Sequence, residues 1–532
     1  MNSTATLTAD QEIWRPKYNP WLIAVVVALA AFMEVLDTSI ANVALPYMAG
    51  NLGASNDQST WVLTSYLVSN AIVLPITGWL AGTLGRKRFF MTCLFLFTVS
   101  SFLCGIAPSL GLLLFFRVLQ GAGGGGLQPM AQAILADTFP PQQRGLAFAL
   151  YGITAVTAPT IGPTLGGWIT FNYSWRWIFF INLPVGVATL FLVLRFVEDP
   201  PYLKRLRAAG VKLDYIGIAL LTLGVGALQV LLDKGQEDDW FGSRFITTLV
   251  VLSAVSLISL VIWEWFQKAP VVDVRLFKSF NFASSNLMMF TLGIMLFSSL
   301  VMMPQFLQTL MGYTSQVAGL AISGGGLMLL FEMPIMGQLT TKVQARYLIA
   351  FGWLCLALAM FYSTKRIDLM ISFSAAAWLR VAQVIGMGFL FVPITLVAYI
   401  GIPPDKNNAV AGIVNFMRNI GSSVGTSLVT TLIARRSQYH QEVLTQYARA
   451  GNPTFQNSVN GLALNLNRSG LNAHAGKMQA YARLYRGVQA QAEALAYIDT
   501  FMVLAVGAAI MFFLAFILRK NDPGGGGRIV AE

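Results

Sequence analysis

The sequence is poor in charged residues. Asp, Glu, Lys and Arg make up only 11% of its 532 residues, and 56% are hydrophobic, whereas about one quarter of a soluble domain is charged. The mean hydropathy is correspondingly high, at +0.64. This composition excludes an ordinary soluble protein and predicts a chain that crosses a lipid bilayer many times.

Cysteine and histidine are scarce as well. The three cysteines, Cys93, Cys104 and Cys355, lie in apolar runs, and the two histidines, His440 and His474, lie in one polar segment. This distribution gives neither a disulfide framework nor the spacing of a metal site. The sequence also has no Gly-x-x-x-x-Gly-Lys-Ser/Thr loop, no His-Glu-x-x-His and no nucleophile elbow. We therefore expect no cofactor, and we disfavour an ATP-driven pump and a membrane-embedded enzyme.

Long apolar runs dominate instead, each near or above the roughly 20 residues that a helix needs to cross a bilayer. They predict an all-α polytopic membrane protein with fourteen transmembrane helices, near residues 21–46, 58–82, 88–107, 109–131, 144–169, 177–197, 214–232, 245–266, 283–308, 315–339, 345–363, 371–400, 408–433 and 497–518. The first run is longer than the apolar core of a cleavable signal, so we expect it to remain as the first helix. An even number of crossings places both termini on one side.

Basic residues are unevenly distributed over this topology. The net charge is +12, and the segments on the side of the termini carry about four times as many Lys and Arg as the loops on the other side. The positive-inside rule therefore predicts cytoplasmic termini. It also accounts for the net charge without a nucleic-acid partner.

An internal repeat divides the chain into two halves, as is typical of secondary transporters. Three short sequences recur at an offset of about 260 residues: RVLQ at 117–120 as RVAQ at 380–383, LPITG at 74–78 as MPIMG at 333–337, and LP at 45–46 as MP at 303–304. We therefore predict a cytoplasmic N-terminal segment (1–20), a six-helix half (21–197), two inserted helices (198–266), a cytoplasmic interfacial segment (267–282), a second six-helix half (283–518) and a cytoplasmic tail (519–532).

Two polar segments interrupt the pattern of apolar runs. Residues 267–282 mix apolar and charged side chains, and they either lie along the cytoplasmic interface or form a simple linker. Residues 434–496 form the longest polar segment and face outward. Apolar residues at helical spacing between 478 and 495 predict an amphipathic hairpin there, suited either to dock a partner protein or to fold over the mouth.

Six charged residues lie inside the predicted spans, where an ionised side chain costs a few kcal/mol or more unless it has a partner or a task. They are Glu34, Asp37, Arg117, Glu332, Arg380 and Arg418. Glu34 and Asp37 lie three residues apart, on nearly the same face of the first helix.

Four motifs in the first five spans make the chain resemble a known family. They are LDTSIANVALP (36–46), GWLAGTLGRKR (78–88), RVLQG (117–121) and APTIGPTLGG (158–167). In this order they are similar to the first-helix signature of fourteen-helix members of the major facilitator superfamily, to its loop between helices 2 and 3, to its helix 4 motif and to its helix 5 antiporter motif. The chain resembles the drug:proton antiporters of the EmrB kind.

This resemblance implies the superfamily fold of two six-helix halves, here with two inserted helices, and proton-driven export of amphipathic compounds by alternating access. It also implies a bacterial inner membrane and, in a tripartite system, a periplasmic adaptor and an outer-membrane channel. The alternatives are a stand-alone exporter of an endogenous metabolite and a passive channel or receptor. Gly82 departs from the family pattern, since many relatives have an aspartate there that helps latch the cytoplasmic side. We expect the latch of this chain to be weaker or built otherwise.

Proton coupling is predicted for Asp37, Arg117 and Glu34. An acid whose access to an arginine changes with conformation can bind a proton on one side of the membrane and release it on the other. Asp37 and Arg117 would form such a pair, and the alternative is a static salt bridge between two helices. Glu34 is either a second proton site or a counter-charge for a cationic substrate.

Two further groups of residues are predicted from their positions. Candidates for the substrate path, where the two halves should meet at the midplane, are Glu34, Glu332, Asn42, Gln120, Gln383, Asn415 and Arg418. Glu332 either lines this path or pairs with Arg380 or Arg418. Candidates for conformational gating, or for close helix packing alone, are Gly78, Gly85, Arg86, Gly162, Pro163, Gly166 and Gly167.

Overall fold

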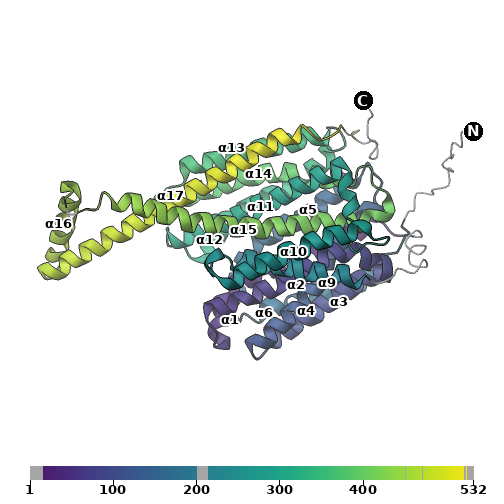
Figure 1. Ribbon diagram of the computed structural model, residues 1–532, viewed down its shortest axis with the longest axis horizontal. Helices are drawn as coiled ribbons and strands as arrows, with labels where there is room; N and C mark the ends of the chain where they lie inside the picture. Colours follow the sequence, from purple (N-terminus) through teal and green to yellow (C-terminus); the bar gives the residue numbers. More distant parts are fainter. Residues whose placement is uncertain (1–15, 201–213, 450, 470, 521–522, 524–532) are drawn as a thin grey trace, which may run out of the picture.

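The computed structural model describes residues 16–200, 214–449, 451–469, 471–520 and 523, and long helices run side by side through it (Figure 1). The first half contains α1 (Pro20–Leu52), α2 (Asn56–Leu84), α3 (Arg86–Ile106), α4 (Leu110–Thr138), α5 (Arg144–Asn172), α6 (Trp177–Phe180) and α7 (Asn182–Phe196). The inserted helices are α9 (Tyr215–Lys234) and α10 (Arg244–Phe266). The second half contains α11 (Phe280–Thr309), α12 (Ser315–Leu339), α13 (Ala345–Arg366), α14 (Phe373–Ala398), α15 (Asn407–Thr445), α16 (Pro453–Arg468) and α17 (Ala473–Ala515).

The predicted all-α class and the fourteen-helix fold are confirmed. Thirteen helices among the described residues are long and apolar enough to cross a membrane, with α6 and α7 together forming one of them. The fourteenth is α15, which misses that criterion because its buried face carries amides and small polar residues, Asn407, Asn408 and Asn415 among them. Most of the predicted segments 1–20 and 519–532, and residues 201–213 before α9, lie outside the described residues.

The last two spans are longer than predicted, because helices continue where the bilayer ends. The predicted spans 408–433 and 497–518 correspond to α15 and α17, which extend through most of the polar segment. Figure 1 shows both helices projecting well beyond the other helices, with α16 at the tip. The expected amphipathic hairpin is therefore helical, and it points away from the helix bundle rather than folding over it. We call residues 434–496 the outer hairpin.

The outer hairpin has a small core of its own. Val459 and Leu466 of α16 pack with Ala480 of α17, and Tyr481 and Leu484 cover them. Polar caps define the ends of these helices: the side chain of Asn452 accepts from the amide of Thr454 at 3.0 Å, and that of Asn472 accepts from the amide of Ala475 at 2.8 Å. The hairpin is thus a folded element and not a loose loop.

Segment 267–282, predicted to lie at the cytoplasmic interface, packs against the helices. Val271 and Leu276 are buried, and residues 274–278 form a short 3-10 helix. Asp273 binds Lys406, which precedes α15, at 2.7 Å. The segment therefore covers the ends of helices and is more than a linker.

The two halves meet along two helix pairs, α5 with α12 and α2 with α15. A Cβ atom at Gly337 of α12 would lie 2.8 Å from Cα of Leu146 in α5, and one at Gly78 of α2 would lie 2.7 Å from Cα of Ala409 in α15. Glycine is needed at both places because the backbones approach so closely. Both pairs are therefore closed at these positions.

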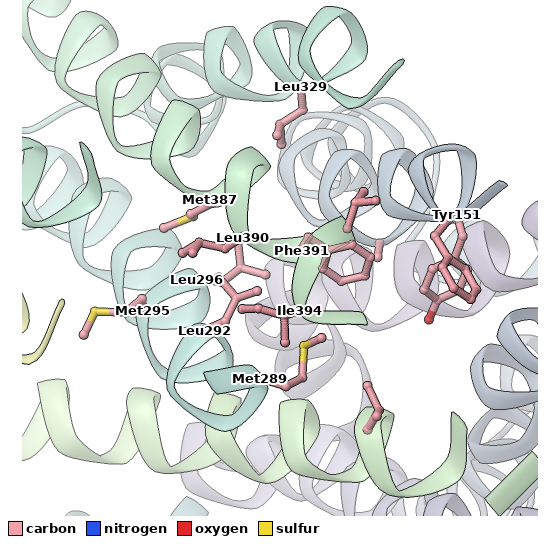
Figure 2. Packing of buried hydrophobic residues seen from close by; sticks show 14 of the residues in the cluster. Tyr151, Met289, Leu292, Met295, Leu296, Leu329, Met387, Leu390, Phe391 and Ile394 are labelled. Carbon is pink, nitrogen blue, oxygen red and sulfur yellow. The ribbon is translucent and has the colours of Figure 1, made fainter. Parts of the chain in front are cut away.

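The core of the second half continues to the boundary between the halves. Figure 2 shows its apolar side chains, from α11 Met289, Leu292, Met295 and Leu296, and from α14 Met387, Leu390, Phe391 and Ile394. Phe391 also stacks on Tyr151 of α5, with ring centroids 5.9 Å apart and an interplanar angle of 30°. The methionines let this core fill irregular gaps between helices.

Gly78 and Gly82, one helical turn apart on α2, offer a matched test of the close approach. Gly78→Ala should destabilise the protein by about 1 to 3 kcal/mol, because the new Cβ would overlap the α15 backbone. Gly82→Ala should be neutral or stabilising, since no neighbouring atom lies within 4 Å of its Cβ position and alanine favours helix. Thermal unfolding of the purified proteins measures both effects; equal midpoints for the two variants would contradict the predicted closure.

Candidate functional site

A buried ion pair lies at the centre of the first half. Asp37 of α1 accepts from Arg117 of α4, with Nη1 and Oδ2 2.7 Å apart, and both side chains are at most 1% exposed. The other carboxylate oxygen accepts from the amide nitrogens of Gln120 at 2.9 Å and Asn182 at 2.7 Å. The structure thus brings the predicted pair together and surrounds the carboxylate with donors from two helices, α4 and α7.

Arg117 is held by further contacts within the same half. Its Nε donates to the carbonyl oxygen of Val62 at 3.1 Å, and its Nη1 donates to Oε1 of Gln120 at 2.7 Å. The guanidinium lies over the ring of Tyr66, 4.3 Å from the centroid. Every one of these partners belongs to the first half, so the two halves can move apart without separating Asp37 from Arg117.

Glu34 lies in a second buried network, one helical turn from Asp37. Its Oε1 accepts from the hydroxyl of Tyr66 and from the amide of Asn70, each at 3.0 Å, and its Oε2 accepts from the amide of Gln128. The oxygen of that same Gln128 accepts from Arg418 of α15. Glu34 is therefore connected, through one side chain, to a cation of the other half.

A further set of hydrogen bonds crosses between the halves beside this connection. The hydroxyl of Tyr151 donates to Asn415 of α15 at 3.0 Å, and it also reaches Gln128 at 3.2 Å. Asn415 in turn donates to Gln132 of α4 at 2.6 Å. Of the predicted substrate-path residues, Glu34, Asn415 and Arg418 thus lie together where the halves meet.

The other substrate-path candidates lie elsewhere. Asn42 is exposed on the C-terminal half of α1, and Gln120 faces Asp37 inside the first half. Gln383 is fully buried in the second half and donates to Ser363 at 3.0 Å. Glu332 is buried against Gly388 of α14.

The alternative prediction for Glu332, an ion pair with Arg380 or Arg418, is wrong for this structure. No such pair is present in the described part of the chain, and both carboxylate oxygens of Glu332 lack a hydrogen-bond partner. Glu332 is held between α12 and α14, whereas Arg418 bonds to Gln128 at the boundary between the halves. Contact with the substrate is therefore the prediction that remains for Glu332.

The latch that the resemblance implies is built here from other residues than the family pattern has. Arg86, only 1% exposed, binds Asp137 at the end of α4 at 2.6 Å and donates to the side chain of Asn408 in α15 at 2.9 Å. Asn407 also donates to Asp137, at 2.5 Å. Asp137 therefore supplies an acid that position 82 lacks, and the expectation that the latch is built otherwise agrees with this geometry. Gly85 next to Arg86 has φ +88°, a value that glycine adopts readily.

The helix 5 motif places its glycines against α1. Cβ atoms at Gly162 and Gly166 would lie 2.3 Å from Oγ of Ser39 and 3.0 Å from Cγ2 of Ile40. Gly167 has more room, with Val43 at 3.9 Å. Pro163 lies between them inside α5. Close packing within the first half accounts for Gly162 and Gly166, and their predicted gating role stays a prediction.

Sequence reasoning missed the neutral polar residues of the site. Tyr66, Asn70, Gln128, Tyr151 and Asn182 hold the two acids or join the halves, yet none carries a charge. An amide inside an apolar span was a usable signal for three of them. An unpaired buried amide costs about as much free energy as a lost hydrogen bond, so such an amide must have a partner. The sequence pointed to the acids, the arginines and the amide of Gln120, but not to these five partners.

Comparisons with known proteins agree with this architecture. A family model described as the Major Facilitator Superfamily matches residues 27–426. The chain is 39% identical over 435 residues to the "Multidrug export protein EmrB" of Escherichia coli (strain K12), covering 82% of this chain and 84% of that protein. It is also 39% identical over 446 residues to the "Fatty acid resistance protein FarB" of Neisseria gonorrhoeae, covering 83% and 86%.

Among solved structures, the fold is similar to that of the human organic anion transporter MFSD10 (TETRAN). The TM-score is 0.57 at 15% identity, and the match covers 94% of this chain and 100% of that one. At this identity the likeness shows the fold alone.

The buried latch can be compared with an exposed ion pair nearby. Asp137→Asn should destabilise the protein by about 3 to 5 kcal/mol, because it leaves the buried Arg86 without its counter-charge. Asp273→Asn removes an acid from the partly exposed pair with Lys406 and should cost less than about 1 kcal/mol. Midpoints of thermal unfolding in detergent measure both, and equal losses would contradict a special role for Asp137.

Proposed function

The chain belongs to the major facilitator superfamily, and we propose that it exports amphipathic compounds in exchange for protons. It is a multi-pass membrane transporter of the EmrB-like kind rather than an enzyme. The observation that carries proton exchange is the carboxylate of Asp37, buried in the first half beside Arg117 with amide donors from two further positions. Burying a carboxylate inside the membrane costs free energy, and a carboxylate can bind a proton on one side of the membrane and release it on the other.

The proposed class of substrate is supported by the names of two relatives and by side chains that lie close to the boundary between the halves. The names of the two relatives refer to multidrug export and to fatty acid resistance. These names point to compounds with apolar bodies. Methionine side chains are flexible and suit binding of varied apolar shapes, and the buried core in Figure 2 contains several of them close to the boundary between the halves. Glu34 adds a buried acid at the boundary between the halves, and it would attract the positive end of a cationic compound.

The two acids have different relations to the movement of the halves. Asp37 and Arg117 stay in one half, so their ion pair does not depend on how the halves are arranged. Glu34 stays in the first half while Arg418 moves with the second, and Gln128 connects them only when the halves are closed at this level. We propose that Asp37 carries the transported proton and that Glu34 responds to the conformation.

The outer hairpin supports a proposal about partners and location. We place the protein in a bacterial inner membrane with cytoplasmic termini, so the hairpin extends into the periplasm. A folded helical element that projects from the bundle is suited to contact a periplasmic adaptor, which in turn would reach an outer-membrane channel. Exposed apolar side chains on it, such as Leu464 and Met478, at 59% each, would favour such a contact.

Asp37→Asn tests the proton exchange directly. Asparagine keeps the shape and accepts one hydrogen bond but cannot titrate, so substrate-dependent proton flux in proteoliposomes should fall at least about 100-fold while the protein still reaches the membrane. The control is Asp233→Asn, which removes an acid of α9 that bonds to Thr64 on α2 and should keep transport within a few-fold. Normal coupled transport by Asp37→Asn would overturn the proposal.

Shortening the outer hairpin tests the partner. Gln441 of α15 donates to the hydroxyl of Tyr485 in α17 at 3.1 Å, so these residues lie at one level and the chain can be rejoined just beyond them by replacing 442–484 with a short Gly-Ser linker. Proton-coupled transport in proteoliposomes should be unchanged, whereas co-purification with an adaptor and efflux from whole cells should be lost. Undiminished efflux from whole cells would show that the hairpin docks no required partner.

A further inference from the structure

Arg380 of α14 is a buried cation without an acid. Its side chain is 0% exposed, and its only hydrogen bond in the described residues goes from Nη1 to the hydroxyl of Ser299, at 2.8 Å. Nε and Nη2 are buried as well and have no acceptor among the described protein groups. An arginine stays protonated inside a protein, so a full positive charge with two unused donors lies in the middle of the second half.

The internal repeat shows what is missing around Arg380. Its counterpart in the first half, Arg117, binds the carboxylate of Asp37 on α1 at 2.7 Å. Ser299 lies on α11, which corresponds to α1, and it contacts the arginine in the same way but brings a neutral hydroxyl. The hydroxyl of Ser299 also donates to the carbonyl oxygen of Leu296 at 3.0 Å. The second half therefore has the cation of this pair but not the anion.

Glu332 is too far away to replace the lost acid. Gly325 packs against Arg380, and Gly388 packs against Glu332, so on the parallel helices α12 and α14 the two charges lie seven or eight residues apart. At 1.5 Å per residue this separation is about 10 to 12 Å. The carboxylate therefore cannot accept a hydrogen bond from Nε or Nη2.

We propose that Arg380 binds a small inorganic anion, such as chloride, through Nε and Nη2. Leaving a buried charge without a counter-charge costs several kcal/mol, and charge-assisted hydrogen bonds to an anion offset that cost. The anion must be small, because a Cβ atom at Gly325 would already lie 3.2 Å from Cγ of Arg380 and the guanidinium has no exposed surface. This site is separate from proton exchange, and binding can be measured without transport.

The test uses the purified full-length protein in a neutral detergent at constant ionic strength. Chloride replaces gluconate in steps, and the midpoint of thermal unfolding is recorded at each step. The midpoint should rise by several degrees and saturate, as expected when a ligand binds only the folded state. Nitrate should act like chloride. A midpoint that is the same in chloride, nitrate and gluconate would overturn the proposal, as would stabilisation by decanoate and not by chloride.

Variants at Ser299 separate this site from general salt effects. Ser299→Asp places a carboxylate next to Arg380, as Asp37 does for Arg117, and it should weaken the apparent chloride affinity at least tenfold. Ser299→Asn has nearly the same shape without charge and should leave the affinity within about threefold, a difference below 1 kcal/mol. If Ser299→Asp keeps the full chloride effect, the anion binds elsewhere and the assignment fails. Arg380→Gln should also lose the effect, and the two Ser299 variants decide the question if that protein does not fold.

Discussion

A charge inside the hydrocarbon region must be neutralised by something close to it, and much of this structure follows from that requirement. Arg117 is neutralised by Asp37, and the amides that complete the pair come from α4 and α7. The packing of α1 against these helices is thereby specified by hydrogen bonds as well as by small residues. Apolar helices in lipid have little hydrophobic reason to choose one neighbour over another, so buried polar pairs fix which helices meet.

The same requirement sets how much could be predicted from the sequence. The charges in the spans were visible, and with the repeat and the motifs they led to the fold and to the Asp37 and Arg117 pair. The partners of Glu34 were not found, because Tyr66, Asn70 and Gln128 lie on α2 and α4, and only the folded arrangement brings them to one point. The replacement of the position 82 acid by Asp137 was equally hidden, since the two residues are 55 positions apart in the sequence.

Helix ends were predicted less well than helix interiors, for a physical reason. The end of an apolar run in the sequence indicates where the chain leaves the bilayer. A helix, however, ends where its backbone is capped or enters a turn. In α15 and α17 those two points differ by several turns, because polar residues outside the membrane continue the helix to Thr445 and from Ala473. The same polar character, on the buried face of α15, explains why this span is the least hydrophobic of the fourteen.

The two acids differ in whether their surroundings depend on the arrangement of the halves. Coupling requires a group whose surroundings differ between the two arrangements of the halves. The Asp37 and Arg117 pair does not meet that requirement by itself, because α1 and α4 belong to one half and move together. Glu34 does meet it, since Gln128 links it to Arg418 of the other half only while the boundary is closed. Separation of the halves would remove Arg418 and leave Glu34 with Tyr66, Asn70 and Gln128, all of the first half, so a proton or cation that replaces the lost positive charge would be favoured in that arrangement.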